Sequence, residues 1–289
     1  MPKIDIPVKR LFQQRPADWA RYIQPGCRAE WVREFKTDFT PRKESRLDSV
    51  LEINDPEGLY LLNFEPMGYR DSSLPARMLR YRSDIWEATL NKGQGTPSIK
   101  QVVMFFSPDD DSKVQSLNDP GRLAYSYDVI RVWEDRRQSV IEAKLVGLYP
   151  LLPLMKGENE QETPEQVLRE SIAIVQEVED EALKQDLLAG MVIFAEGKFA
   201  KDLVKSLIRR DMVMQSTIFQ EWAEEEGAKA KVEDICEYLD VKFGASSLDL
   251  QKQIMNISEL NILKRIVSGI YKAGTIEEAQ AVILGTKRQ

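Results

Sequence analysis

The fold is decided by a short, almost continuously apolar stretch, Leu-Tyr-Leu-Leu-Asn-Phe-Glu-Pro-Met at residues 59–67. Residues 59–64 predict a strand buried on both faces, because a strand with one solvated face alternates apolar and polar side chains. Residues 47–53 do alternate in this way and predict a neighbouring strand. Pro56 and Gly58 supply the turn between the two strands.

A helix and two more strands are predicted on the C-terminal side. Residues 75–91 carry apolar side chains at helical spacing and stop before Gly93, so they predict a helix. Residues 101–106 and 124–133 are rich in Val, Ile, Phe and Tyr, and each segment predicts a strand. The order strand, strand, helix, strand, strand predicts an α/β fold with a mixed sheet flanked by helices.

The second half of the chain predicts helices only. Residues 157–163 are polar and form the predicted boundary between an α/β domain, residues 1–156, and an all-helical region, residues 163–289. Thr163 predicts the first helix start, since it is followed by Pro and, three residues on, by a Gln that can reach back to the cap. Residues 212–242 predict a long helix that ends before a glycine.

The composition is that of a soluble globular protein, with 289 residues of which 43% are hydrophobic and 30% charged. The chain contains no histidine. This excludes the Ser-His-Asp and Cys-His nucleophile systems and zinc bound by imidazole. Any catalysis must use carboxylates, lysine or a hard cation bound by oxygen ligands, and magnesium chemistry satisfies that condition.

The net charge of −7 argues against a protein that coats nucleic acid indiscriminately. Residues 1–150 carry 23 Lys and Arg against 22 Asp and Glu, whereas the remainder carries 17 against 25. A local basic cleft is therefore compatible with the first half. Its basic cluster of Lys36, Arg42, Lys43 and Arg46 either approaches nucleic acid or forms a solvated loop of mixed charge.

No membrane partner or secretory signal is expected. The longest apolar run, residues 145–155, contains two prolines and is shorter than the roughly 20 residues of a membrane-spanning helix. Residues 1–12 are charged and lack an apolar core. Cys27 and Cys236 lie far apart in the sequence and predict reduced thiols, so we expect a cytoplasmic protein.

Asp48, Glu65 and Met67 form the candidate catalytic group at the ends of the first two predicted strands. Side chains two residues apart in a strand share a face, so Glu65 and Met67 point the same way. An acid that enters one strand and an acid that leaves its neighbour can converge on one divalent cation. Such a cation polarises a phosphodiester and lowers the pKa of an attacking water. The simpler alternative is that Asp48 and Glu65 are two solvated turn acids.

Three segments resemble one known family. They are Leu-Asp-Ser-Val-Leu at 47–51, Leu-Leu-Asn-Phe-Glu-Pro-Met at 61–67 and Arg-Met-Leu-Arg-Tyr at 77–81. Together they resemble the recombination-promoting nuclease (Rpn) family, also described as YhgA-like transposases, of the PD-(D/E)XK nuclease superfamily. The family pattern is an Asp on one strand, an apolar strand ending in Glu-x-Gln, and a helix opening near Arg-Met-x-x-Tyr. The spacing from Glu65 to Arg77 matches without a gap, and the resemblance covers most of residues 40–285.

The resemblance implies a restriction-endonuclease-like fold for the first domain and a DNA endonuclease that depends on Mg²⁺ or Mn²⁺. It implies three metal ligands: Asp48, Glu65 and the backbone carbonyl of Pro66. Arg77 and Arg80 share a face of the predicted helix and are candidate phosphate contacts. The alternative for these arginines is pairing within the helix, such as that of Arg80 with Asp84.

One position departs from the family pattern. The family Gln, or the superfamily Lys, falls on Met67, whose thioether has no N–H donor and no charge. The attacking water would be less well placed, and loss of a positioned acid–base group typically lowers the rate by on the order of 10² to 10⁴. The resemblance therefore implies a nuclease that is weakened at this position.

Two other functions stay open on the sequence. The first is a non-catalytic descendant of the fold that binds nucleic acid through the same cleft. The second is an interaction protein that forms homo-oligomers through the helices of residues 163–289. The run Asp109-Asp110-Asp111 predicts a hydrated turn rather than a metal site, since Asp favours turns.

Overall fold

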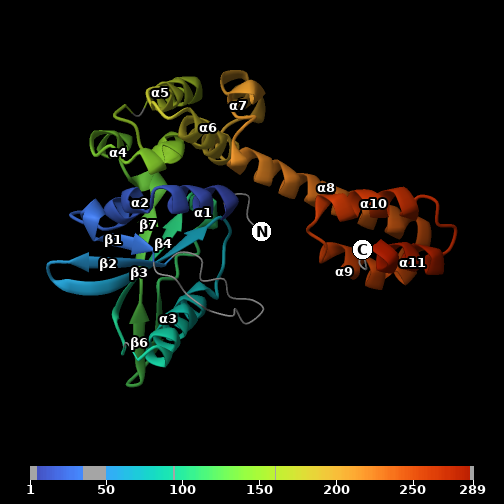
Figure 1. Ribbon diagram of the computed structural model, residues 1–289, viewed down its shortest axis with the longest axis horizontal. Coiled ribbons are helices and arrows are strands. Elements are labelled where there is room, and N and C mark those ends of the chain that lie inside the picture. Colours follow the sequence, from blue (N-terminus) through green and yellow to red (C-terminus); the bar gives the residue numbers. More distant parts are fainter. Residues whose placement is uncertain (1–4, 35–49, 94, 160, 287–289) are drawn as a thin grey trace. The chain divides into compact units, whose positions relative to one another are not determined.

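The computed structural model describes residues 5–34, 50–93, 95–159 and 161–286 (Figure 1). The chain divides into two compact units, Met1–Phe219 and Gln220–Gln289. Within the described ranges no helix is long and apolar enough to cross a membrane. Cys27 and Cys236 are both free thiols.

The first unit is built on a five-stranded mixed sheet in the order β1-β2-β3-β4-β7. Its strands are β1 (Val32–Glu34), β2 (Val50–Asp55), β3 (Gly58–Met67), β4 (Ser98–Phe105) and β7 (Asp128–Arg131). The pairs β1–β2 and β2–β3 are antiparallel, whereas β3–β4 and β4–β7 are parallel. The predicted α/β class and its mixed sheet flanked by helices are confirmed.

Helices cover both faces of β3, as its continuous apolar run predicts. On one face Phe64 stacks on Phe12 of α1 (Asp5–Gln14), with ring centroids 5.4 Å apart. Trp19 of α2 (Pro16–Ile23) lies against the same ring. On the other face Leu61 packs with Ile85 of α3 (Leu74–Asn91). In Figure 1, α1 and α2 lie on one side of the sheet and α3 on the other.

The single strand predicted over residues 124–133 is wrong: the segment contains parts of two separate strands, and residues 132 and 133 lie in a 3-10 helix, η3 (Val132–Glu134). The first part of the segment forms β6 (Leu123–Ser126), which pairs with β5 (Ser116–Asp119) in a separate hairpin. Its second part forms β7, which joins the main sheet. The apolar composition is continuous across both parts, so it does not reveal that the strand partner changes at Tyr127.

The buried hydroxyl of Tyr125 connects the β5–β6 hairpin to the main sheet. It donates to Gln101 Oε1 at 2.8 Å, and Gln101 Nε2 donates to Asn63 Oδ1 at 2.9 Å and to the backbone carbonyl of Met78 at 2.8 Å. These polar groups are buried yet satisfied, which a folded interior requires. The network joins β3, β4, α3 and β6 on one face of the sheet.

After β7 the first unit continues as helices. They are η3 (Val132–Glu134), α4 (Arg137–Glu142), η4 (Val146–Leu154), α5 (Pro164–Gln176), α6 (Glu181–Ala195), α7 (Lys201–Leu207) and η5 (Arg210–Met212). The first three lie before residue 156, inside the segment that we assigned to the α/β domain. The predicted capping box at the start of α5 is confirmed. The backbone N–H of Thr163 donates to Gln166 Oε1 at 2.8 Å, and Thr163 Oγ1 accepts from the backbone N–H of Gln166 at 3.3 Å.

The chain divides inside α8 (Thr217–Phe243), further along than the polar segment 157–163 where we placed the domain boundary. The physical reason is that α6 packs on η4 and α1. The buried carboxylate of Asp186 in α6 accepts from Gln14 Nε2 at 2.5 Å and from Ser216 Oγ at 2.7 Å. These contacts join α5–α7 to the first unit.

The second unit is a small helical bundle. It contains the rest of α8, η6 (Gly244–Ser247), α9 (Leu248–Met255), α10 (Leu260–Ile270) and α11 (Ile276–Thr286). Its apolar core includes Ile235 and Leu239 of α8, with Leu263 and Ile266 of α10. The predicted long helix ends where expected, because Gly244 takes a positive φ of +57° that most other residues avoid.

Candidate functional site

Charged side chains gather where the parallel strands β3, β4 and β7 end. The three strands end level with one another, at Met67, Phe105 and Arg131. In the sheet, Phe105 pairs with Met67 on one side and with Arg131 on the other. In α/β sheets, ligands bind outside the carboxyl ends of parallel strands. Glu65 near the end of β3 and Arg77 in the first turn of α3 are therefore in a favourable place for a site.

Glu65 and Arg77 form an ion pair at this edge. The distance from Glu65 Oε1 to Arg77 Nη2 is 3.2 Å, and the two side chains are 18% and 16% exposed. This partial exposure leaves the pair accessible from solvent while it strengthens the attraction relative to a fully exposed pair. Glu65 and Arg77, which lie 12 residues apart in the sequence, are thus in direct contact.

Asp71 is a second carboxylate on the same guanidinium, and our sequence reasoning did not find it. Its Oδ2 lies 3.0 Å from Arg77 Nη1. Its Oδ1 accepts from the backbone N–H of Ser73 at 2.8 Å and from Ser73 Oγ at 2.7 Å. An Asp two residues before a Ser at a helix start is a common local turn, so this sequence pattern would have been the available signal.

Met67 and Glu65 lie on the same face of β3, as predicted. The evidence is that both side chains contact Arg77. The Met67 sulfur lies 2.9 Å from Arg77 Nη2, and its side chain has no exposed surface. Met67 packs with Met78 and Phe105 in the apolar cluster beneath α3. The position that would hold the family Gln is therefore part of the core in this chain.

Two tyrosines complete the surroundings of Arg77. The Tyr69 hydroxyl accepts from Arg77 Nη1 at 2.6 Å, and Tyr69 is 43% exposed. Burial lowers the pKa of Arg77, but the charge of Glu65 and the bond to Tyr69 outweigh burial, so the pKa is raised. Burial, followed by the charge of Glu65, raises the pKa of Tyr81 to about 12. Arg77 and Tyr81 thus keep their protons near neutral pH.

Arg80 is exposed on α3, and its guanidinium carbon lies 5.8 Å from the centroid of the Tyr81 ring. Asp48 and the basic cluster of Lys36, Arg42, Lys43 and Arg46 lie outside the described residues. Their assigned roles stay predictions.

The described residues include oxygen ligands of the type that a divalent cation prefers, but they do not form a cation site. Glu65 and Asp71 offer carboxylate oxygens, and Pro66 offers a backbone carbonyl, which are the ligand types that magnesium prefers. Within the described residues, no group of three or more His, Cys, Asp or Glu side chains could hold a metal ion. A metal centre on Glu65 would therefore need a ligand from outside them, and Asp48 is the predicted one.

Arg131 and Asp111 form a further ion pair at the same strand edge. Arg131 Nε donates to Asp111 Oδ2 at 2.8 Å. Asp111 is buried, although we expected a hydrated turn. Burial alone would raise the pKa of Asp111, but hydrogen bonds from Arg131 and from the backbone N–H of Lys113 outweigh it, so the pKa is lowered. The reason for the difference is that Arg131, 20 residues away in the sequence, supplies a partner for the buried carboxylate.

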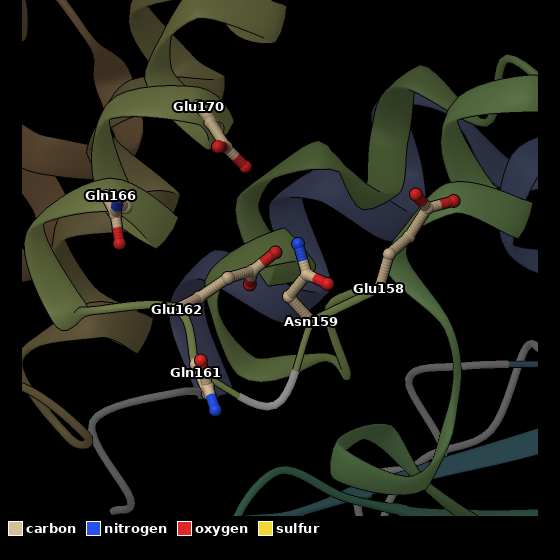
Figure 2. Close-up of a pocket in the computed structure, with 6 residues that line it drawn as sticks. All are labelled: Glu158, Asn159, Gln161, Glu162, Gln166 and Glu170. Carbon is tan, nitrogen blue, oxygen red and sulfur yellow. The ribbon is translucent and has the colours of Figure 1, made fainter.

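A pocket of about 620 Å³ lies between the loop after η4 and α5 (Figure 2). It is lined by carboxylates and carboxamides: Glu158, Asn159, Gln161, Glu162, Gln166 and Glu170. Glu162 forms an ion pair with the buried guanidinium of Arg137, which gives this carboxylate a structural partner. The pocket is formed by different elements from the Glu65–Arg77 pair and carries no residue of the predicted site.

Comparison with protein-family models, with curated proteins and with solved structures finds no match for this chain.

Proposed function

We propose that this chain is an endonuclease that uses Mg²⁺ or Mn²⁺ to hydrolyse DNA, with a fold of the restriction-endonuclease-like kind in its first unit. The resemblance to the Rpn family within the PD-(D/E)XK superfamily motivates the proposal. The observation that carries it is the contact between Glu65 and Arg77 at the carboxyl edge of the parallel strands. A metal ligand and a phosphate-binding cation must be neighbours in such a site.

Each residue has a distinct role in the proposal. Glu65, Asp48 and the backbone carbonyl of Pro66 bind the metal, and Arg77 contacts the scissile phosphate. Arg80, exposed on the same helix, contacts the DNA backbone further away. When bound, the metal polarises the phosphodiester and lowers the pKa of the attacking water. Met67 is buried and contributes no donor for that water, so we expect slow cleavage.

The proposal also requires that the antiparallel pairing of β2 with β3 continues beyond Val50. Val50 is the first described residue of β2, and it pairs with Asn63, two residues before Glu65. Asp48 precedes Val50 by two residues in the sequence. Because an antiparallel partner runs in the opposite direction, the proposal requires this pairing to continue far enough to bring Asp48 to Glu65.

Nicking of supercoiled plasmid tests the proposal. The full chain is incubated with plasmid in Mg²⁺ or in Mn²⁺, and the expected result is slow nicking that Glu65→Gln and Asp48→Ala each abolish. Glu57→Gln is the matched control, because Glu57 is exposed in the turn at the opposite end of β3. Nicking that survives both Glu65→Gln and Asp48→Ala would remove the assignment.

Binding of nucleic acid without cleavage is the second candidate, and the burial of Met67 favours it. A site in which the water-positioning residue is part of the core can keep its phosphate contacts and lose turnover. This function predicts DNA binding whose affinity falls steeply with salt, because phosphate contacts release counterions. It also predicts no strand scission in either metal.

A further inference from the structure

A pocket of about 880 Å³ adjoins the one in Figure 2 and shares three lining residues with it. This volume is in the range of small-molecule sites. Basic side chains from three separate segments line the pocket: Arg136 before α4, Lys156 after η4 and Lys198 after α6. The nuclease site proposed above is formed by other elements, so a ligand of this pocket is independent of the proposed function.

Two backbone carbonyls fix the amine of Lys198 at the wall of this pocket. Lys198 Nζ donates to the carbonyl of Pro153 at 2.9 Å and to that of Leu154 at 3.3 Å, at the end of η4. A neutral amine has two N–H groups and one lone pair. Because the two carbonyls accept two N–H groups, the remaining tetrahedral position of Nζ is the one left for a reactant in the pocket.

The surroundings of Lys198 favour its neutral form. Partial burial, followed by the charge of Arg137, lowers the pKa of Lys198. Arg137 is buried and forms an ion pair with Glu162. A lysine whose pKa is lowered is a better nucleophile near neutral pH, because a larger fraction of the amine is unprotonated.

Arg136 and Lys156 offer a place for an anionic group. They pair in an isolated parallel bridge, so their side chains leave the backbone on the same side. Among the described residues, neither side chain makes a hydrogen bond or an ion pair. Four glutamates line the same pocket, and none of them forms an ion pair with Arg136 or Lys156. An anion bound between the two cations would offset the repulsion between their charges.

We propose that Lys198 is a nucleophilic amine that forms an imine with an aldehyde carrying an anionic group, and that Arg136 and Lys156 bind that group. After the ammonium releases one proton to solvent, the Nζ lone pair attacks the aldehyde carbon. The C–N bond forms, the C–O bond breaks, and the oxygen leaves as water with both N–H hydrogen atoms. No group is oxidised or reduced. Protonation of the imine nitrogen then restores one N–H for the carbonyls at the end of η4.

Labelling of individual lysines tests the nucleophile. The full chain is treated near neutral pH with 4-formylbenzoate, an aldehyde that carries a carboxylate, and cyanoborohydride reduces each imine to a stable amine. Peptide mass spectrometry then measures the label at each lysine. Lys198 is expected to react at least about fivefold faster than Lys201. Lys201 is the matched comparison, because it is exposed at the start of α7 and does not line the pocket. Reaction of Lys198 no faster than Lys201 would overturn the proposal.

Lys198→Arg separates the nucleophile from a role in capping η4. Arginine keeps N–H donors for the carbonyls of Pro153 and Leu154 but forms no imine with this aldehyde, so the variant should fold and lose the fast phase of labelling. Thermal melting establishes that it is folded. A folded Lys198→Arg protein that keeps the fast phase would assign the nucleophile to another residue.

Benzoate, which lacks the aldehyde, tests whether the reaction takes place in a binding pocket. It is expected to slow the labelling of Lys198 by 4-formylbenzoate and to leave the labelling of Lys201 unchanged. Labelling of Lys198 that benzoate does not slow would show that no bound anion guides the reaction, and the binding half of the proposal would be wrong.

The uncharged aldehyde 4-formylbenzamide, which has the same size, tests the anion site. With rates taken relative to Lys201, Lys198 of wild type is expected to prefer 4-formylbenzoate by at least about fivefold. The double variant Arg136→Gln/Lys156→Gln should lose this preference.

The matched control is Lys205→Gln/Arg210→Gln, which changes the net charge equally at exposed positions that do not line the pocket. It should keep the preference for 4-formylbenzoate. If the two double variants lose the preference equally, the effect is general electrostatics and the anion site at Arg136 and Lys156 is wrong. If both keep it, that site is also wrong.

Discussion

The sulfur of Met67 lies 2.9 Å from Nη2 of Arg77, the same nitrogen that contacts Glu65. Thioether sulfur is a weak hydrogen-bond acceptor and cannot donate. Met67 therefore fills the space beside Glu65 and Arg77 without orienting a water molecule.

Met67→Gln is expected to raise plasmid nicking by about tenfold or more, because the new amide can accept from Arg77 and adds an N–H donor beside Glu65, where the thioether has none. Met67→Lys is expected to be unstable, since its ammonium would be buried next to the Arg77 guanidinium. Nicking rates in Mg²⁺ and melting temperatures measure both effects. A folded Met67→Gln protein with an unchanged rate would contradict this account of weakened activity.

Asp111→Asn is expected to lower the free energy of unfolding by about 1–3 kcal/mol near neutral pH, because the buried partner of Arg131 loses its charge. The pKa of Asp111 is lowered below its ordinary value of 3.8. Its stabilising contribution is therefore present above pH 3.8 and is lost as the pH falls through the folded pKa.

Urea unfolding of wild type and Asp111→Asn at several pH values checks this dependence. The difference between the two proteins should shrink as the pH falls below 3.8. Asp109→Asn is the control, because Asp109 is exposed in the same turn. A stability difference for Asp111→Asn that is constant across the acid range would show that the ion pair is not its source.

Gly269→Ala is expected to destabilise the second unit by about 1–3 kcal/mol, since overpacking forces neighbouring side chains to shift. A Cβ at this position of α10 would lie 2.6 Å from Val282 Cγ1 of α11. Gly285→Ala is the matched control, because nothing lies within 4 Å of its added Cβ. Alanine there should stabilise by about 0.5–1 kcal/mol through its higher helix propensity. Equal melting temperatures for the two variants would argue against the α10–α11 packing.

Gln101→Leu is expected to destabilise the first unit by about 2–5 kcal/mol, because Asn63, Tyr125 and the carbonyl of Met78 would lose a buried partner. Gln138→Leu, at an exposed position of α4, should change stability by no more than about 0.5 kcal/mol. Urea unfolding compares the two. A small effect of Gln101→Leu would mean that the buried network contributes little to stability.

The sheet could be predicted because its signals are local. The apolar run of residues 59–64 marks a strand buried on both faces, and helices do cover it on both faces. The helix expected at 75–91 is α3, and the capping box at Thr163 starts α5. Each of these elements is specified by side chains within a few positions of one another.

The features that sequence reasoning missed depend on distant partners. Helices α1 and α2 contribute Phe12 and Trp19 to the core, but their contact with Phe64 is not visible in their own sequence. The role of Asp71 depends on the position of Arg77 across the β3–α3 turn. Burial of Asp111, in the loop after β4, depends on Arg131 of β7. Local patterns do not encode such tertiary pairs.

The contact between Asp186 of α6 and Gln14 of α1 can form only late in synthesis of the protein, because 172 residues separate the two. The partners of Asp186, Gln14 and Ser216, lie 172 residues before it and 30 residues after it, so α1 reaches a ribosome exit long before α6 exists. Until then, the apolar face that α1 presents to α6 has no cover from that helix, which exposes the nascent chain to aggregation.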